Sequence, residues 1–454
     1  MSEPGPAQDD SAARRVLELA IQTSPISVGL IVGLAVTQQV KLTAAAVGGL
    51  IVALIGVTWP VTLVAGMWLG MLFDRLGITG MNMGGFPITA SKLSVLGSIG
   101  LWILHAVLTR SPLFRWHPVF TAMLGFIVAT GVTTAWSNCM TVGKFDIFGL
   151  AMMTVMMSLV YSALAEAELK PLFRFLGGMF LIALLASIRH GGGSTEYGRS
   201  AGTMGDPNEW ATMVILLTPL FLGGLASDEE WTGRPIRMGL VMLAPLAVLV
   251  SASRAALVMG ALISPGCLWL FRHRKGEIMA CMGTAVLAAP FAVDLNTAWS
   301  RLVSLVQTFN GHAVVQDDSL EERSELARQG KQLFLDHWFL GAGPGNFSHA
   351  TGFISTEGFF RPAHDTYLEV ASEQGIVGLI PFFIFLGSIG WALRRGFGSA
   401  TTEDDRNRIA GAALGLTALG LMAATLGLLT FSMAYLVVGF SLAILHQARL
   451  NANG

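Results

Sequence analysis

Long apolar segments separated by short polar connections follow one another along most of the chain. A helix of about 20 apolar residues, within a range of roughly 17–25, spans the hydrocarbon core of a bilayer. The pattern therefore predicts an all-α polytopic transmembrane bundle of about 12–14 helices. The candidate segments, some of them short, are residues 26–41, 43–58, 60–73, 92–109, 119–135, 146–164, 171–188, 209–225, 237–252, 254–271, 278–293, 366–393, 408–425 and 428–446. The pairs that meet near Trp59-Pro60 and Ser253-Arg254 leave open whether each pair is one interrupted helix.

A polar stretch at residues 294–363 interrupts this hydrophobic pattern. Within it, Ser319 and Glu322 have the spacing of a capping box, which predicts a helix that begins at Ser319. Further along, Gly341–Phe347 is a glycine-rich turn in which the backbone can approach a ligand closely. A loop of this length is uncommon and, when ordered, usually serves a function. We therefore expect a long, partly helical loop that contributes to the site.

Composition and charge place the chain in a membrane and orient it there. Of its residues 53% are hydrophobic and 13% charged, whereas soluble domains carry about 25% charged residues. Lys and Arg are more abundant in loops on the side of the N-terminus than in short loops on the other side, which predicts that both termini are cytoplasmic. The predicted organisation is a cytoplasmic tail at 1–25, transmembrane helices at 26–293, a periplasmic loop at 294–363, transmembrane helices at 364–446 and a cytoplasmic tail at 447–454.

Several partners and site types are disfavoured by the same composition. The net charge of -1 argues against a nucleic-acid partner, which needs a clustered basic face. The three scattered cysteines do not form a disulfide framework. His337 and His349, with the aspartates near them in the loop, lack the spacing of a metal site, so we expect neither a metal ion nor another cofactor.

The predicted orientation brings four basic residues, distant in sequence, to the outer face: Arg189, Arg199, Arg254 and His364. An arginine at a membrane boundary is costly unless it is paired, so Arg254 is expected to bind either a phosphate or a loop carboxylate. His364 has an ordinary pKa near 6.5 and is a candidate general base. Alternatively, it only occupies the start of a helix.

The segment before residue 210 predicts a helix start that is suited to anions. Asp206 has the position of an N-cap, followed by Pro207 at the first helical position. Glycines and Arg199 precede it, and such a combination can form a cradle for an anion. The alternative is an ordinary, well-capped helix start.

Four motifs, in this order, resemble those of the O-antigen ligase and O-antigen polymerase superfamily of bacterial envelope glycosyltransferases. They are the turn Gly202–Asn208, the helix start Ser253-Arg254, the loop Gly341–Phe347, and the segment from His364 to Gly378. Two positions depart from the family pattern. Ala255 replaces a glycine, and Asp365 follows the histidine where ligases have Asn, Ser or Gln, which weakens the assignment to a ligase proper.

The resemblance implies an enzyme that transfers a glycan from undecaprenyl pyrophosphate to a hydroxyl at the periplasmic face of the inner membrane. The acceptor would be lipid A–core for a ligase or another glycan for a polymerase. By this resemblance, Arg199 and Arg254 hold the pyrophosphate and His364 takes the hydroxyl proton, oriented by Asp365 or Glu373. Further substrate contacts are expected from Arg189, Asn208, Gly343, Gly345 and Tyr367.

Three alternatives stay open at this point. The first is a polymerase that extends an exopolysaccharide or O-antigen, and the second is a member of the superfamily that glycosylates proteins. The third is a transporter for lipid-linked sugars, which fits many helices and outward arginines. Transporters often contain internal repeats, and this sequence shows none.

Overall fold

A computed structural model describes residues 54–72, 82–83, 86–87, 90–137, 140–189, 200–204, 206–292, 303, 318–352 and 363–453. The predicted helix at 26–41, most of that at 43–58, and Arg199 lie outside the described residues. Apart from a two-stranded ribbon of β1 (Asn82–Met83) and β2 (Phe86–Pro87), the described elements are helical.

The helices agree with the segments predicted from hydrophobicity. They are α3 (Val61–Leu72), α4 (Ala90–Thr109), α5 (Pro118–Ala135), α6 (Met140–Leu164), α7 (Leu169–Arg189), α8 (Pro207–Gly224), α9 (Gly233–Ser251), α10 (Arg254–Leu270), α11 (Lys275–Ala292), α13 (Asp318–Asp336), α14 (Phe347–Thr351), α15 (Thr366–Ser399), α16 (Glu403–Met422) and α17 (Ser432–Asn453). Within the described part of the chain, 7 helices are long and apolar enough to cross a membrane. The all-α polytopic bundle is therefore confirmed.

Two details at helix ends differ from or refine the prediction. Helix α13 begins at Asp318, one residue before Ser319, so Ser319 lies in the first turn of the helix and is not its N-cap. Helices α9 and α10 are separate, because Ala252 adopts a left-handed φ of 50° and Ser253 has extended backbone before Arg254. A left-handed residue cannot continue a right-handed helix.

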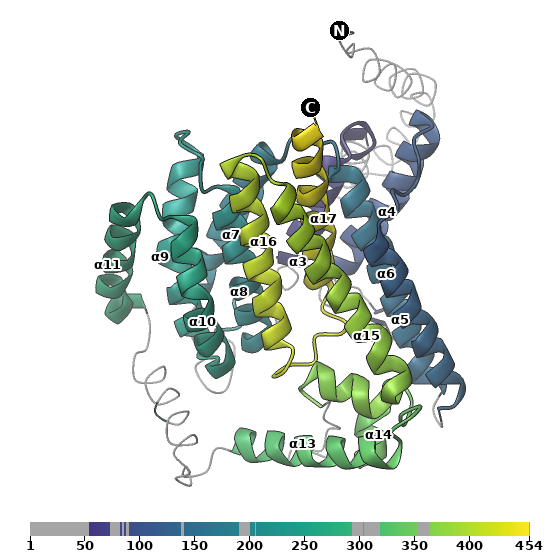
Figure 1. The fold of residues 1–454 in the computed structure, drawn as a ribbon. Helices are drawn as coiled ribbons and strands as arrows, with labels where there is room; N and C mark the ends of the chain where they lie inside the picture. The colour runs from purple at the N-terminus through teal and green to yellow at the C-terminus, as the bar shows by residue number, and fades with distance from the viewer. Residues whose placement is uncertain are drawn as a thin grey trace, which may run out of the picture.

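The helices run side by side, and α13 and α14 lie across one end of the bundle (Figure 1). We name this end the α13 end, and the other the opposite end, where the C-terminus lies (Figure 1). Helices α8, α10 and α15 all begin at the α13 end (Figure 1). A hydrogen bond from Ser200 N to Val250 O (3.1 Å) ties the segment before α8 to the end of α9. The predicted outer-face segments thus share one end of the bundle.

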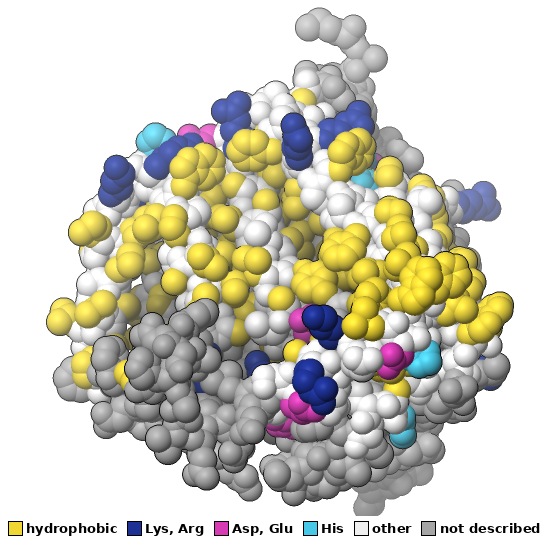
Figure 2. Space-filling model, turned by 60° about the horizontal axis from the view of Figure 1, so that its bottom comes forward, with side chains coloured by type: hydrophobic (Ala, Val, Ile, Leu, Met, Phe, Trp, Pro, Cys, Tyr) yellow, Lys and Arg dark blue, Asp and Glu magenta, His cyan; other side chains and the backbone are white. Residues whose placement is uncertain are grey.

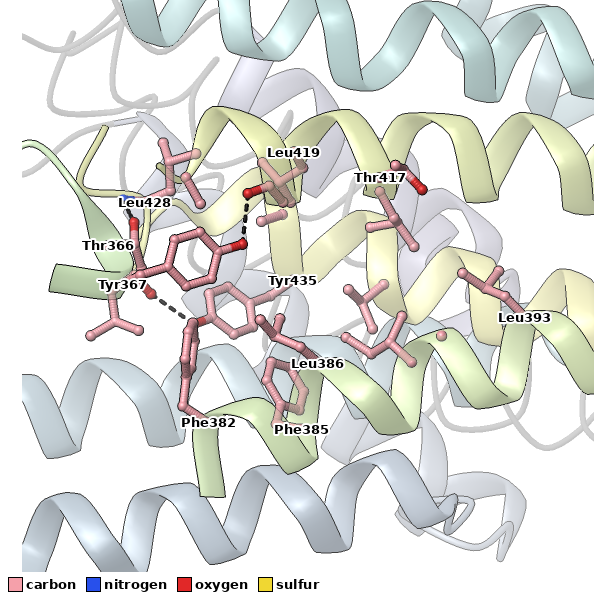
Figure 3. A pocket seen from close by; sticks show the side chains of 18 residues that line it. Thr366, Tyr367, Phe382, Phe385, Leu386, Leu393, Thr417, Leu419, Leu428 and Tyr435 are labelled. Carbon is pink, nitrogen blue, oxygen red and sulfur yellow. Dashed lines mark hydrogen bonds between the residues drawn. The ribbon is translucent and has the colours of Figure 1, made fainter. Parts of the chain in front are cut away.

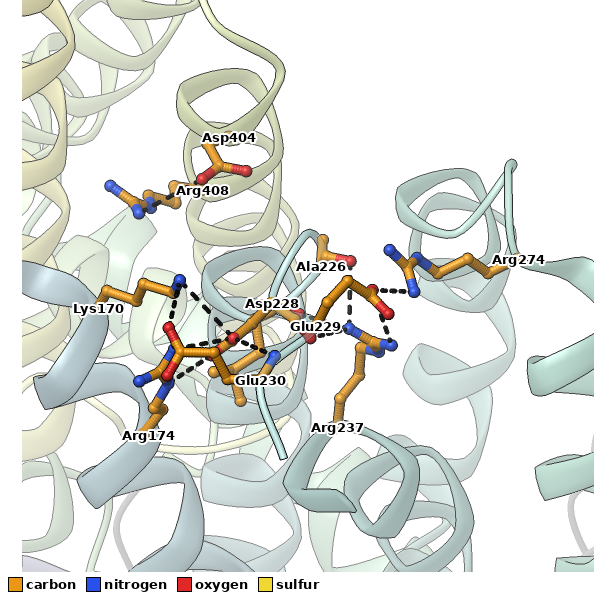
Figure 4. A network of polar contacts seen from close by, with 11 residues as sticks. Lys170, Arg174, Ala226, Asp228, Glu229, Glu230, Arg237, Arg274, Asp404 and Arg408 are labelled. Atoms are coloured by element: carbon orange, nitrogen blue, oxygen red, sulfur yellow. Dashed lines mark hydrogen bonds and ion pairs between the residues drawn. The ribbon is translucent and has the colours of Figure 1, made fainter. Parts of the chain in front are cut away.

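Basic side chains gather at the opposite end, above a broad band of hydrophobic atoms (Figure 2). There Arg174 donates to Asp228 from Nε (2.6 Å) and Nη2 (2.9 Å) (Figure 4). Arg237 contacts Glu277 (3.1 Å). Arg237 is buried and also donates to the backbone oxygens of Leu225 and Asp228. These arginines are among those predicted to lie in the cytoplasm, so the structure separates the two charge groups as the sequence suggested.

Helices α8 and α16 pack backbone against backbone at the centre of the bundle. A Cβ atom added at Gly411 would lie 2.4 Å from Pro219 O, and one at Gly415 would lie 2.4 Å from Leu216 O. A Cβ at Gly223 would lie 2.4 Å from Asn407 O. Small residues spaced by four allow such close approach of membrane helices. At this seam the backbones of α8 and α16 are therefore in direct contact.

Candidate functional site

Helix α15 is broken at Gly375, nine residues after its start. Gly375 has φ 58° and ψ -157°, a conformation that is essentially restricted to glycine. The break frees N–H groups after it, and Ile376 N and Val377 N donate to Trp338 O (2.9 Å) and Phe339 O (3.2 Å). The break therefore joins α15 to the segment that follows α13.

The glycine-rich loop is bound to the first half of α15. Its N–H groups at Ala342 and Gly343 donate to Ser372 O (2.9 Å) and Glu373 O (2.8 Å). Gly341 and Gly343 have positive φ values of 72° and 102°, and a Cβ at Gly341 would lie 2.2 Å from the Glu373 backbone. Glycine is needed here because the loop backbone lies directly on the helix backbone.

The Glu373 carboxylate completes this attachment. It is 4% exposed and accepts hydrogen bonds from Gly345 N (2.8 Å) and Phe347 N (2.9 Å). Both carboxylate oxygens are thus used by the loop, and so are the N–H groups of Gly343 and Gly345. In the structure, Gly343, Gly345 and Glu373 hold the loop on α15. Direct contact of these residues with substrate, and an orienting role of Glu373 toward His364, stay predictions.

Two buried polar contacts link the same region to α5. Asn346 Nδ2 donates to Ser137 Oγ (2.7 Å), and Thr130 Oγ1 donates to Gln374 Oε1 (3.0 Å). Each joins residues more than 200 positions apart in the chain. The loop, α15 and α5 therefore form one packed unit at the α13 end.

His364 directly precedes this unit. It has a left-handed φ of 51° and is half-buried. Non-glycine residues in this conformation are uncommon, although histidine is among the more tolerant types. The next residue, Asp365, caps α15, because its Oδ1 accepts from Tyr367 N (2.9 Å) and Leu368 N (3.0 Å). Half-burial raises the pKa of Asp365, and the two backbone hydrogen bonds oppose that rise.

Arg254 is the first residue of α10 and is half-buried at the α13 end. Ser253 precedes it as N-cap, yet its side chain makes no capping hydrogen bond. Ser253 is 1% exposed, and its Oγ has no hydrogen-bond partner among the described residues. A buried hydroxyl without a partner is costly in a native structure, so Ser253 Oγ is a candidate contact for a bound group.

The turn before α8 contains a second hydroxyl of this kind. Thr203 is 5% exposed, and its Oγ1 also lacks a partner within the described part of the chain. As predicted, Asp206 caps α8 by accepting from Asn208 N (2.7 Å) and Glu209 N (3.1 Å). Asn208 is half-buried in the first turn, and the exposed Arg189 ends α7 at the α13 end.

Tyr367, a predicted substrate contact, turns into the bundle. Its hydroxyl donates to Gly420 O (2.6 Å), and its ring lines a cavity between α15, α16 and α17 (Figure 3). Within the described residues, no group of three or more His, Cys, Asp or Glu side chains is arranged to hold a metal ion.

Comparison with known protein families adds to this geometry. Residues 239–383 match the family model described as O-antigen ligase. This match covers about a third of the chain and supports membership of the O-antigen ligase superfamily. No curated protein matches the chain. The region that matches the O-antigen ligase model contains Arg254, the loop Gly341–Phe347 and His364.

Membership has consequences for the class of protein. The superfamily comprises glycosyltransferase-like ligases and polymerases of polysaccharide biosynthesis, which use a lipid-linked glycan and a polysaccharide acceptor. The apolar helices indicate a multi-pass membrane protein, and the family match supports an enzyme of this kind.

Sequence reasoning missed several residues of this superfamily member's site region. Ser253 was recognised only as part of a motif, and the contacts of Ser137 and Gln374 left no local signal because their partners are far away in sequence. Glu369 lies one helical turn before Glu373. In the structure Glu369 Oε2 is buried without a hydrogen-bond partner among the described residues, whereas Glu373 binds the loop.

Proposed function

We propose that this superfamily member transfers a glycan from undecaprenyl pyrophosphate to an acceptor hydroxyl at the periplasmic face of the inner membrane. The observation that carries the proposal is the position of Arg254 and His364. Each stands at the start of a helix within the matched region, and both helices begin at the α13 end. The loop 294–363 would then lie in the periplasm.

The start of α10 is suited to the leaving group. The helix N-terminus carries a partial positive charge and N–H groups without helical partners. Arg254 adds a permanent charge, and the unpartnered Ser253 Oγ adds a donor. Together they stabilise the negative charge that develops on pyrophosphate. We propose that this replaces a metal ion, so the rate should be unchanged by a chelator.

His364 is suited to activate the acceptor. The acceptor hydroxyl gives its proton to the imidazole, and its oxygen forms a bond to the anomeric carbon of the donor glycan. The bond from that carbon to the pyrophosphate oxygen breaks, and the pyrophosphate keeps the electron pair. A base within hydrogen-bond reach is required for this proton transfer.

The capping role of Asp365 bears on whether the enzyme is a ligase or a polymerase. Asp, Asn and Ser all serve as N-caps, so an Asp at a position where ligases have Asn or Ser fulfils the same structural role. We therefore propose a ligase, with lipid A–core as acceptor. A polymerase of the same superfamily is the alternative that the experiment below separates.

The catalytic assignment predicts the effect of two substitutions. His364→Asn keeps a residue type that tolerates positive φ and should lower kcat by about 10²–10⁴-fold because the base is lost. Arg254→Ala should lower it by about 10²–10³-fold because charge stabilisation is lost. The measurement is product formation by purified enzyme in liposomes with a lipid-linked glycan.

The matched control is Arg328→Ala, which removes an arginine of α13 that pairs with Glu325 on the surface. It should retain full activity. Unchanged activity in both His364→Asn and Arg254→Ala would contradict the assignment.

The acceptor is identified by the same reconstitution. Product on added lipid A–core indicates a ligase, and chain lengthening without an added acceptor indicates a polymerase. Transport of the lipid-linked glycan without any covalent product would overturn the enzyme proposal.

A further inference from the structure

The turn that follows α13 carries three exposed apolar side chains. Leu335, Trp338 and Phe339 are 57%, 55% and 55% exposed. A hydrogen bond from His337 N to Leu333 O (3.0 Å) continues the helical geometry past the end of α13. Residues spaced by three and four lie on one face of a helix. The three side chains therefore form one surface, which we name the 335–339 patch.

The other sides of the same segment are occupied differently. Leu326 and Leu333 are buried with Phe347 in a small hydrophobic cluster, which holds α13 on the bundle. Asp336 and His337, between the residues of the patch in sequence, are exposed. The segment thus has a buried apolar side, a charged side and the exposed apolar side formed by the patch.

Backbone hydrogen bonds fix the position of the patch along α15. The carbonyl oxygens of Trp338 and Phe339 accept from Ile376 N (2.9 Å) and Val377 N (3.2 Å), directly after the break in that helix. Ile380 is exposed, in a helix that is long and apolar enough to cross a membrane. The rise from Ile376 to Ile380 is about 6 Å, at 1.5 Å per residue. The patch therefore lies about one turn from side chains of α15 that face lipid.

A third exposed aromatic residue marks the same level of the bundle. Trp136 is the exposed C-cap of α5. Its neighbour Ser137 accepts a hydrogen bond from Asn346 of the glycine-rich loop (2.7 Å), so the end of α5 and the loop are at one level. Tryptophan is enriched where lipid meets water, because its ring is apolar and its N–H is polar. Trp136 and Trp338 thus indicate a membrane boundary at this level.

The surface of the molecule agrees with this position. On one side, the hydrophobic band comes down directly to acidic and histidine side chains of the α13 end (Figure 2). Helix α13 itself lies across that end of the bundle (Figure 1). A helix that carries Leu, Phe and Trp on one face and charges on another is suited to lie in the plane of a membrane interface.

We propose that the 335–339 patch inserts between the headgroups and acyl chains of the leaflet at the α13 end, and that it anchors the glycine-rich loop to the bilayer. The occupant is membrane lipid, because the patch is continuous with the lipid-facing side of α15. Gly341 follows Phe339 by two residues, so the anchor sets the depth of the loop relative to the membrane surface. The inference needs only a membrane-spanning α15 and does not depend on the proposed glycan transfer.

A depth measurement in liposomes tests the insertion. Cys139, Cys267 and Cys281 are first replaced by alanine, and a single fluorophore is attached to Leu335→Cys, which keeps both aromatic residues of the patch. His337→Cys is the matched control on the charged side. Nitroxide-labelled phosphatidylcholine in the bilayer should quench the fluorophore at 335, and aqueous iodide should not. The fluorophore at 337 should respond in the opposite way.

Two results would overturn the insertion. Quenching at 335 by iodide alone would show that the patch faces water. Protection from both quenchers would show that protein covers the patch, either a second copy of this chain or another protein.

The anchoring role is tested by hydrogen exchange of the loop Gly341–Phe347 in liposomes. Trp338→Gln should speed exchange by about tenfold, equivalent to about 1.4 kcal/mol. Trp338→Tyr should keep the original rate, because tyrosine is also suited to the interface. His337→Gln is the control and should leave exchange unchanged. Unchanged exchange in Trp338→Gln, or equally fast exchange in His337→Gln, would overturn the anchoring role. Neither measurement requires product formation, so each gives its answer even if the proposed function fails.

Discussion

The role of Asp365 that the sequence suggests differs from the role that its backbone contacts show. From the sequence it was a departure from a ligase motif, because only the residue type was visible. In the structure its carboxylate caps α15. Asp206 has the same role at α8, and there the following Pro207 made the cap predictable. Asp365 has no proline after it, and its position next to the candidate base His364 suggested a catalytic role instead.

The capping role of Asp365 can be separated from a catalytic one. Asp365→Asn and Asp365→Ser should keep both stability and activity, since each side chain can cap. Asp365→Ala should lower the free energy of unfolding by about 0.5–2 kcal/mol. Thermal unfolding in detergent and the rate of glycan transfer are measured together. A folded but inactive Asp365→Asn would show that the negative charge itself is needed, as expected if it orients His364.

At the scale of elements, the positions of the helices were predictable from hydrophobicity, whereas the break within α15 was not. Hydrophobic length indicated a helix at 366–393, and α15 occupies Thr366–Ser399. The break at Gly375 has no signal in hydrophobicity, because glycines such as Gly387 also occur where the same helix is regular. The glycine loop was recognised as a place of close approach, but its partner was expected to be a ligand. The backbone of α15 fills that place.

The break is expected to be essential to the position of the loop. In Gly375→Ala the new Cβ would lie 2.4 Å from Phe339 O, and the backbone conformation would be strained by roughly 1–3 kcal/mol. The variant should unfold at lower temperature and expose the loop Gly341–Phe347 to limited proteolysis. Gly387→Ala is the control, because a Cβ there meets nothing within 4 Å in the same helix. Similar proteolysis of both variants would argue against this role of the break.

For the whole molecule, the count of Lys and Arg residues in the loops predicted which loops lie together at each end of the bundle. The arginines assigned to the cytoplasm lie together and form the ion pairs of the opposite end (Figure 4). Charge counting cannot show which carboxylate meets which arginine, since Arg174 and Asp228 are 54 positions apart. The apolar cavity between α15, α16 and α17 was also beyond prediction, because every membrane helix is apolar and only packing reveals where space is left.

The ion pairs predict how stability depends on pH. Burial alone would raise the pKa of Asp228, but hydrogen bonds from Arg174 and the Glu230 backbone outweigh it and keep the pKa below its usual value. Hydrogen bonds from Arg174 and Lys170 likewise lower the pKa of Glu230. A lowered pKa in the folded state stabilises the protein above the unfolded value, near pH 4, and this contribution is lost as the pH falls further.

The melting temperature in detergent should therefore fall as the pH is lowered below about 4. Asp228→Asn should melt earlier at pH 7, because Arg174 loses its buried partner, and should show a flatter decline in acid. Glu166→Gln, which removes an exposed pair with Arg115, is the control and should follow the unchanged protein. An equally steep decline in Asp228→Asn would contradict this origin of the acid sensitivity.

The contact between α8 and α16 also bears on movement during a reaction cycle. Where two helices touch through Gly411 and Gly415, no side chain is present that could rotate to absorb a displacement. We therefore expect the pair to act as a stiff strut that keeps Pro207 and Met422 at a fixed separation. Substrate entry and product exit would then require shifts of the helices on either side of the strut, and each side could open independently of the other.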